Sequence, residues 1–301
     1  MWITYPIWPK YEKDFVSLHL ECMTTEPRWP KARQPVSLSP PYTRFANDMR
    51  PLILISNDDG YQAKGIQFLA QTLRQLGDII VVAPTEGRSG MACACTFREP
   101  VYRALIHSEE GLEVYCCSGT PVDCVKLAIS SICPRTPDII VGGINHGDNS
   151  AINAHYSGTM GVVMEGCMKG IPSVAFSIDS HEMEPDFNPM APYILKITKY
   201  ILDKGLPKGS CLNVNCPALP SFKGMKMCRM ADGLWLNEFE QRNHPRGGDY
   251  FWLTGFFNLV EGQGNEADKE AMNEGFVAVT PIHIDMTDYE LKAVLEKELL
   301  S

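Results

Sequence analysis

The chain has 301 residues, 45% of them hydrophobic and 21% charged, a mixture typical of a globular protein with a sizeable core. Its formal net charge of -9, without any Lys/Arg-rich run, argues against nucleic-acid polymers as partners and is compatible with a small phosphorylated substrate. The eleven cysteines lack the paired spacing of a zinc ribbon or of a secreted disulfide framework, so we expect reduced thiols in a cytoplasmic protein. We also expect no membrane contact, because the N-terminal residues offer no apolar span.

Residues 1–49 are predicted to be an irregular N-terminal extension. They combine Trp2, Trp8 and Trp29 with prolines and charges, and they contain no apolar stretch that would form a signal-peptide core or span a bilayer. Regular patterning begins at Arg50, directly after Met49. We therefore expect translation to start naturally at Met49. Mass spectrometry that finds an N-terminus upstream of Met49 in the native protein would contradict this expectation.

Residues 50–180 alternate between buried strands and helices. A strand over 52–55, a helix over 66–76 that ends at Gly77, and a strand over 79–82 predict a βαβ unit. Thr120, Pro121 and Asp123 then have the pattern of a helix start. The other expected elements are a strand over 112–115, a helix from 121 to 132, a strand over 139–141, a helix over 158–168 and a strand over 174–176. This order predicts an α/β fold with a doubly wound, mostly parallel sheet, whose catalytic core is 50–180.

Residues 181–301 show a looser pattern and are expected to complete the core. Short strand-like stretches at 212–214 and 276–279, separated by Gly- and Asn-rich turns, indicate β-hairpins between about 211 and 284. Residues 288–300 have the pattern of a terminal amphipathic helix.

The first polar cluster, Ser56-Asn57-Asp58-Asp59-Gly60, follows the first buried strand. Two adjacent carboxylates at a buried strand end repel each other, and a divalent cation between them would stabilise both in the ionised form. A solvated Asx turn closed by Gly60 explains the same residues about equally well.

Two more clusters follow later strands at the same predicted edge. Gly87-Arg88-Ser89-Gly90 offers a hydroxyl and a guanidinium, although a plain Gly-rich connection is the commoner meaning of such a loop, and the loop 142–149 offers the amide of Asn145. Together the clusters supply only oxygen ligands, which favours Mg²⁺ or Mn²⁺ over zinc. Tyr156-Ser157-Gly158-Thr159 then opens a helix, where free N–H groups would bind phosphate, and simple N-capping by Ser157 is an equally good interpretation.

In order and spacing, these motifs resemble those of the SurE family of 5′/3′-nucleotidases. The resemblance runs from about Arg50 to Thr287 and leaves the N-terminal extension unexplained. Its motifs are Asn57-Asp58-Asp59-Gly60, Gly65-Ile66, Val82-Ala83-Pro84, Arg88-Ser89-Gly90, Ser118-Gly119-Thr120-Pro121, Asp123-Cys124-Val125, Gly143-Ile144-Asn145, Tyr156-Ser157-Gly158-Thr159, Glu165-Gly166 and 275–281.

The resemblance implies a Rossmann-like fold and metal-dependent hydrolysis of nucleoside 5′- and 3′-monophosphates, with short polyphosphate as a further substrate class. One Mg²⁺ or Mn²⁺ per subunit would be held by Asp58, Asp59, Ser89 and Asn145, the two aspartates also being catalytic. It also implies a homodimer or homotetramer that exchanges C-terminal segments, for which residues 225–275 are the natural region. Phosphate binding is expected at Asn57, Gly90, Ser157, Gly158 and Thr159. Gly87, Lys64 and the loop after Asn145 depart from the family's usual residues and leave the four ligands intact.

The expected mechanism is metal-assisted attack of a water in line with the leaving nucleoside oxygen, with one aspartate as a candidate general base. His146 and His155 are candidates for protonating the leaving group, although a role within the loop is at least twice as common for such residues. Two other functions remain: a receiver-like domain that takes phosphate onto an aspartate, and a dinucleotide-binding oxidoreductase. The second ranks last, since the first βα turn lacks G-x-G-x-x-G.

Overall fold

The computed structural model describes residues 50–182, 184–264 and 266–300, so the predicted extension over 1–49 lies outside the described part. Its main feature is a nine-stranded sheet with the order β3-β4-β2-β1-β5-β6-β7-β13-β8. The sheet strands are β1 (Leu52–Ser56), β2 (Asp78–Pro84), β3 (Arg103–Glu109), β4 (Leu112–Cys117), β5 (Ile139–His146), β6 (Ser173–Asp179), β7 (Ser210–Pro217), β8 (Met225–Met227) and β13 (Val277–His283).

The centre of the sheet is parallel and its two sides are mixed. Strands β4, β2, β1, β5, β6 and β7 pair in parallel along this order. β3 pairs antiparallel with β4 at one edge, and β13 pairs antiparallel with β7 near the other. The predicted doubly wound, mostly parallel α/β sheet is therefore confirmed.

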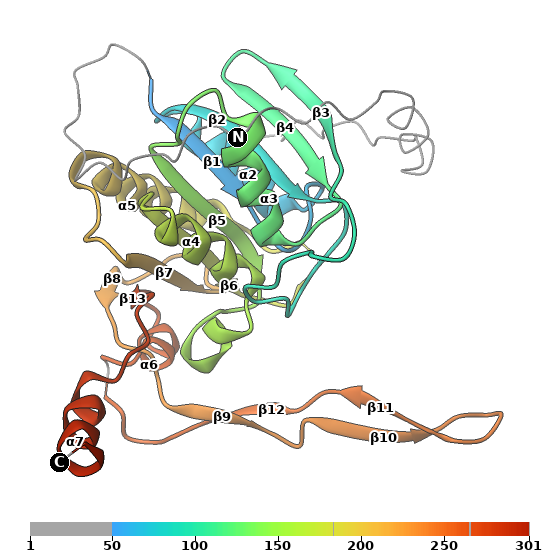
Figure 1. The fold of residues 1–301 in the computed structure, drawn as a ribbon, viewed down its shortest axis with the longest axis vertical. Helices are drawn as coiled ribbons and strands as arrows, with labels where there is room; N and C mark the ends of the chain where they lie inside the picture. The colour runs from blue at the N-terminus through green and yellow to red at the C-terminus, as the bar shows by residue number, and fades with distance from the viewer. Residues whose placement is uncertain (1–49, 183, 265, 301) are drawn as a thin grey trace.

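Helices cover both faces of this sheet (Figure 1). They are α2 (Lys64–Leu73), α3 (Pro121–Leu127) with the π-helical turn η1 (Ala128–Ile132), α4 (Gly158–Met168), α5 (Ala191–Lys204) after the short 3-10 helix η3 (Asn188–Met190), and α6 (Asp268–Asn273). Ile53 and Ile55 pack with α2 and α5 in one apolar cluster, whereas Leu52 and Leu54 pack with α3 and α4 in another. Alternate residues of one strand thus enter two cores, which is why β1 is apolar throughout.

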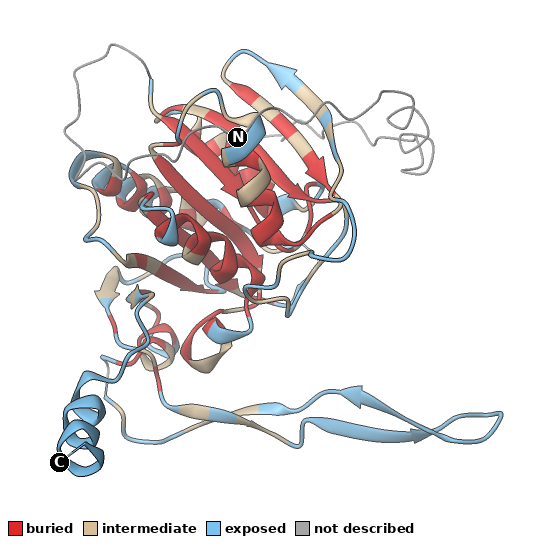
Figure 2. Cartoon of the chain, viewed as in Figure 1, coloured by how far each residue is buried: buried red, intermediate tan, exposed pale blue. Residues whose placement is uncertain are grey.

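A long two-stranded arm leaves the body of the molecule, and a separate helix ends the described chain (Figure 1). The arm consists of β9 (Gly233–Leu236) paired with β12 (Phe256–Leu259), and β10 (Phe239–Asn243) paired with β11 (Asp249–Leu253). The C-terminal helix is α7 (Tyr289–Leu299), and all its residues are exposed, as is most of the arm (Figure 2). These elements confirm the predicted hairpins and terminal helix.

The elements that were not anticipated from the sequence include β3, α5 and the short helix α6. The edge strand β3 alternates between exposed and half-buried residues, and it lies in a stretch for which no element was expected. Helix α5 buries Ile194, Ile197 and Ile201, whose spacing of three to four residues is a helical signal that the sequence does carry.

Within the described residues, no helix is long and apolar enough to cross a membrane.

Candidate metal and phosphate site

Three loops meet at one edge of the sheet because they follow neighbouring parallel strands. β1 lies between β2 and β5 in the sheet. β1 ends at Ser56, β2 at Pro84 and β5 at His146. The first two polar clusters lie in the loops after β1 and β2, whereas Asn145, expected in a loop, is one of the last residues of β5. The carboxyl ends of parallel strands gather these residues, as is usual in open α/β sheets.

Asp58 is almost completely buried against the start of α4. Its Oδ1 accepts a hydrogen bond of 2.5 Å from the Thr159 hydroxyl. Burial raises the pKa of Asp58, and bonds from Thr159 and from the backbone of Gly158 act against that rise. A Cβ on Gly158 would lie 2.7 Å from the Asp58 Cβ, so only glycine lets the helix start approach this carboxylate so closely. The positive end of α4 thus faces an anion of the protein itself.

Asp59 is the second carboxylate of the pair and is less buried. Its Oδ2 accepts the His146 backbone N–H at 3.3 Å. Burial, and then the neighbouring charge of Asp58, raise the pKa of Asp59 to about 7. Two carboxylates with raised pKa values beside each other are the arrangement that a divalent cation would stabilise.

Asn145 completes this group with an amide whose orientation is defined. Its Nδ2 donates to the carbonyl oxygens of His146 and Gly147, at 3.1 and 2.7 Å. Its Oδ1 is therefore directed the other way, where the Thr159 hydroxyl lies 3.5 Å from it and also bonds Asp58. The hydroxyl of Thr159 connects two of the predicted ligands.

Ser89 is exposed and lies in the loop after β2. The preceding residue, Arg88, donates its backbone N–H to the Asp58 carbonyl at 2.6 Å, and a Cβ on Gly87 would lie 4.0 Å from the Asp59 carbonyl. The backbone of this loop is thus in contact with the acidic pair. The next residue, Gly90, has a φ of +76°, which glycine adopts freely.

Three residues predicted to bind phosphate have side chains that are already engaged, among them Thr159, whose hydroxyl bonds Asp58. Asn57 donates to the Gly60 carbonyl at 3.0 Å and accepts from the Gly60 N–H at 3.2 Å, which is the Asx turn named above. Ser157 is the N-cap of α4, and its hydroxyl accepts from Met160 N at 3.0 Å. Their phosphate contacts stay a prediction.

The donor set fits a hard divalent cation. No group of three or more His, Cys, Asp and Glu residues suited to a metal ion occurs in the described part of the chain. What the three loops offer is two carboxylates with neutral amide and hydroxyl oxygens, the ligand type of Mg²⁺ and Mn²⁺. The His146 ring stacks on Phe187 with centroids 5.6 Å apart, and burial lowers its pKa.

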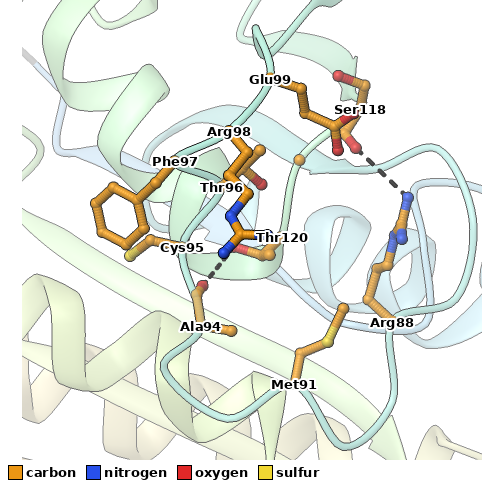
Figure 3. Close-up of a pocket in the computed structure, with 11 residues that line it drawn as sticks. Arg88, Met91, Ala94, Cys95, Thr96, Phe97, Arg98, Glu99, Ser118 and Thr120 are labelled. Atoms are coloured by element: carbon orange, nitrogen blue, oxygen red, sulfur yellow. Dashed lines mark hydrogen bonds between the residues drawn. The ribbon is translucent and has the colours of Figure 1, made fainter.

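A pocket of about 360 Å³ lies beside the Ser89 loop (Figure 3). Arg88 lines it and approaches the Ser118 carbonyl oxygen at 3.5 Å. Thr96, Phe97 and Arg98 line its other side. Thr120 lines it as well, and its hydroxyl donates to the Ala94 carbonyl at 2.7 Å. The hollow is thus partly apolar and is lined by the guanidinium groups of Arg88 and Arg98 together with Glu99.

The residues that brace the Asn145 loop were missed from the sequence. Asn215 Oδ1 accepts from Asn149 N at 2.7 Å, and Asn213 Nδ2 donates to the Asn149 carbonyl at 2.7 Å. Their signal was two asparagines at alternate positions of the otherwise apolar strand β7, which places both on one face.

Comparison with known proteins gives one consistent family. A family model described as "Survival protein SurE" matches residues 53–237. "5'-nucleotidase SurE" of Phocaeicola vulgatus is 53% identical over 240 residues, which cover 80% of this chain and 93% of that protein. The protein of the same name from Bacteroides thetaiotaomicron is 55% identical, with the same coverage. The crystal structure of the SurE protein from Aquifex aeolicus superposes with a TM-score of 0.71 and 33% identity, covering 82% of this chain and 99% of that one.

Proposed function

This chain belongs to the SurE family of metal-dependent 5′-nucleotidases, and we propose that it hydrolyses nucleoside 5′- and 3′-monophosphates at the acidic pair, using one Mg²⁺ or Mn²⁺ per subunit. The products are a nucleoside and inorganic phosphate. The proposed ligands are Asp58, Asp59, Ser89 and Asn145.

One observation carries this assignment to the site. Thr159 bonds Asp58 Oδ1 at 2.5 Å and lies 3.5 Å from Asn145 Oδ1, so oxygens from the loop after β1, from β5 and from α4 lie close together. Burying two adjacent carboxylates beside an amide oxygen is unfavourable, and neither apolar packing nor a structural role at this strand end requires both charges. The cation supplies neutralisation of phosphate oxygens and makes an attacking water more acidic.

The residues of the chain have separate roles in this proposal. Asp58 is held by Thr159 and serves to bind the cation. Asp59 is bonded only through Oδ2 within the described residues, so its Oδ1 is the proposed acceptor of the proton from the attacking water. The phosphate would lie near Gly158 and Thr159 at the start of α4, where the positive end of the helix favours an anion beside the cation that Asp58 would bind. Ser157, Asn57 and Gly90 are the other proposed phosphate contacts.

The nucleoside has room in the pocket beside Ser89. Its volume of about 360 Å³ lies within the range of small-molecule sites, about 300–1,000 Å³. The Phe97 ring is 90% exposed and Arg98 has no ion pair in the described part of the chain, so both are available to a base. We propose that Arg98→Ala weakens hydrolysis of AMP more than that of p-nitrophenyl phosphate, which has no nucleoside.

Phosphate release tests the assignment of the acidic pair. Purified protein with Mn²⁺ or Mg²⁺ is expected to release phosphate from AMP and GMP through many turnovers. Asp58→Asn is expected to lower kcat/KM at least about a hundredfold, because it removes a charged ligand. Asp203→Asn is the matched control, since Asp203 is exposed on α5 and pairs with Lys199 at 3.0 Å. Equal activity of both variants would contradict the assignment.

The same assay separates the enzyme from a receiver-like domain. A receiver would take up at most one phosphate per chain and would retain it on an aspartate. Sustained release in large excess over protein supports the hydrolase, whereas stoichiometric labelling of the chain supports the receiver.

We also propose that the chain forms a homodimer or homotetramer through its C-terminal part. The support is apolar surface on the arm: Phe239, Trp252 and Leu253 are 66%, 62% and 71% exposed. Exposed apolar area of this kind marks interaction surfaces. Light scattering on a chain with 237–255 replaced by a short turn should give a smaller assembly than the full chain. The cytoplasmic location stays a prediction from the cysteine pattern.

A further inference from the structure

The loop from Asn145 to Thr159 carries both a proposed metal ligand and the start of α4, and several of its backbone groups bond residues outside the loop. Ala151, at the beginning of the 3-10 helix η2 (Ala151–His155), has a φ of +49°. Residues with a Cβ rarely adopt this left-handed conformation, so surrounding bonds must maintain it.

Asp268 provides one of these bonds from a distant part of the chain. The residue is fully buried at the start of α6, and its Oδ2 accepts the Ala151 N–H at 3.0 Å. Its Oδ1 accepts the N–H groups of Ala231 and Lys269, at 2.9 and 2.8 Å. A single carboxylate therefore joins the loop to α6 and to the residue from which the arm begins.

Lys269 adds a second connection to the same loop. Its Nζ lies 3.0 Å from Asp148 Oδ1 and 3.1 Å from Asp179 Oδ2 at the end of β6, and its side chain is 19% exposed. Ion pairs of such low exposure are sensitive to the removal of one partner. The arm reaches the loop as well, because Trp235 Nε1 of β9 donates to Asn153 Oδ1 at 2.8 Å.

We infer that Asp268 and Lys269 are positioning residues for the nucleotidase site: they hold the Asn145–Thr159 loop in the conformation in which Asn145 and the start of α4 meet Asp58. The inference rests on the proposed function. Both residues follow the arm in the sequence, more than a hundred positions after the proposed metal ligands, and still help to set the geometry of the site.

The decisive variant is Asp268→Asn, which keeps the size of the side chain. An amide nitrogen cannot accept a hydrogen bond, so either the N–H of Ala151 or the N–H groups of Ala231 and Lys269 lose their acceptor. We expect the dissociation constant for Mn²⁺, measured by isothermal titration calorimetry, to rise about tenfold, and kcat for AMP to fall by about the same factor. Circular dichroism at the assay temperature should match the wild type.

The matched control is Asp288→Asn. Asp288 also uses its carboxylate to accept a backbone N–H at a helix start, from Leu291 at 2.8 Å, but it caps the exposed helix α7. Both measurements should stay within about twofold of the wild type. A role in global stability alone would leave the Mn²⁺ constant and kcat of either folded variant unchanged, which distinguishes it from positioning.

Ala151→Gly supplies a rescue test. Glycine adopts positive φ without the steric cost, so adding this change to Asp268→Asn should restore part of the lost Mn²⁺ affinity. If Asp268→Asn does not fold, Lys269→Met decides the inference by the same two measurements, with Lys199→Met as the exposed control.

The outcomes separate this inference from the proposed function. The inference alone would be overturned if the wild type is active and folded Asp268→Asn keeps the Mn²⁺ dissociation constant and kcat of the wild type. If Asp268→Asn does not fold, the same result for folded Lys269→Met would overturn it. A wild-type chain that neither binds Mn²⁺ nor releases phosphate from AMP would overturn the proposed function, and the inference with it.

Discussion

Raising the pH of the metal-free protein should weaken its fold, because Asp59 then becomes charged in a buried place. The pKa of Asp59 rises from its ordinary 3.8 to about 7 in the folded chain, through burial and the charge of Asp58. Below pH 4 the Asp59 carboxyl is protonated in both the folded and unfolded states, so it does not lower the free energy of unfolding there. Between pH 4 and 7 the unfolded chain ionises first, and the free energy of unfolding decreases as the pH rises.

The magnitude follows from the two pKa values. A rise from 3.8 to about 7 corresponds to about 4 kcal/mol at high pH, of which about 3 kcal/mol develops between pH 5 and pH 8. Solvent at this partly exposed carboxylate should roughly halve the effect, leaving about 1.5 kcal/mol. In a domain of this size that is a decrease in Tm of roughly 4 °C.

Urea unfolding with EDTA at pH 5 and pH 8 measures this change, and Asp59→Asn isolates it from other titrating groups. We expect the variant to lose less stability than the wild type over this interval, and Mn²⁺ to stabilise the wild type more at pH 8 than at pH 5. Parallel pH dependences of wild type and variant would refute the reasoning.

Further variants test other parts of the site. Thr159→Val should raise the Mn²⁺ dissociation constant about tenfold in calorimetry because it removes the hydroxyl between Asp58 and Asn145, whereas Thr159→Ser should not. Gly65→Ala would place a Cβ 2.2 Å from the Ile144 carbonyl oxygen and should lower the free energy of unfolding by about 2 kcal/mol in urea. Gly87→Ala meets no atom closer than 4.0 Å and should stay within about 0.5 kcal/mol.

Much of the fold could be predicted because its signals are local. The apolar runs of β1, β2 and β5 and the capping box of Thr120 and Asp123, both of whose bonds form, depend on neighbouring residues alone. The positions of the acidic pair and Asn145 at the carboxyl ends of parallel strands could be predicted as well, since parallel strands bring these ends to one edge.

The sequence by itself thus determined the α/β order, the family resemblance and the residues of the candidate site. Tertiary structure alone decided how that site is supported: Thr159 meets Asp58 across 101 residues, and Asp268 meets Ala151 across 117. The reason is physical. A hydrogen bond between distant segments has no period and no spacing along the chain, so it exists only after the sheet has brought its partners together.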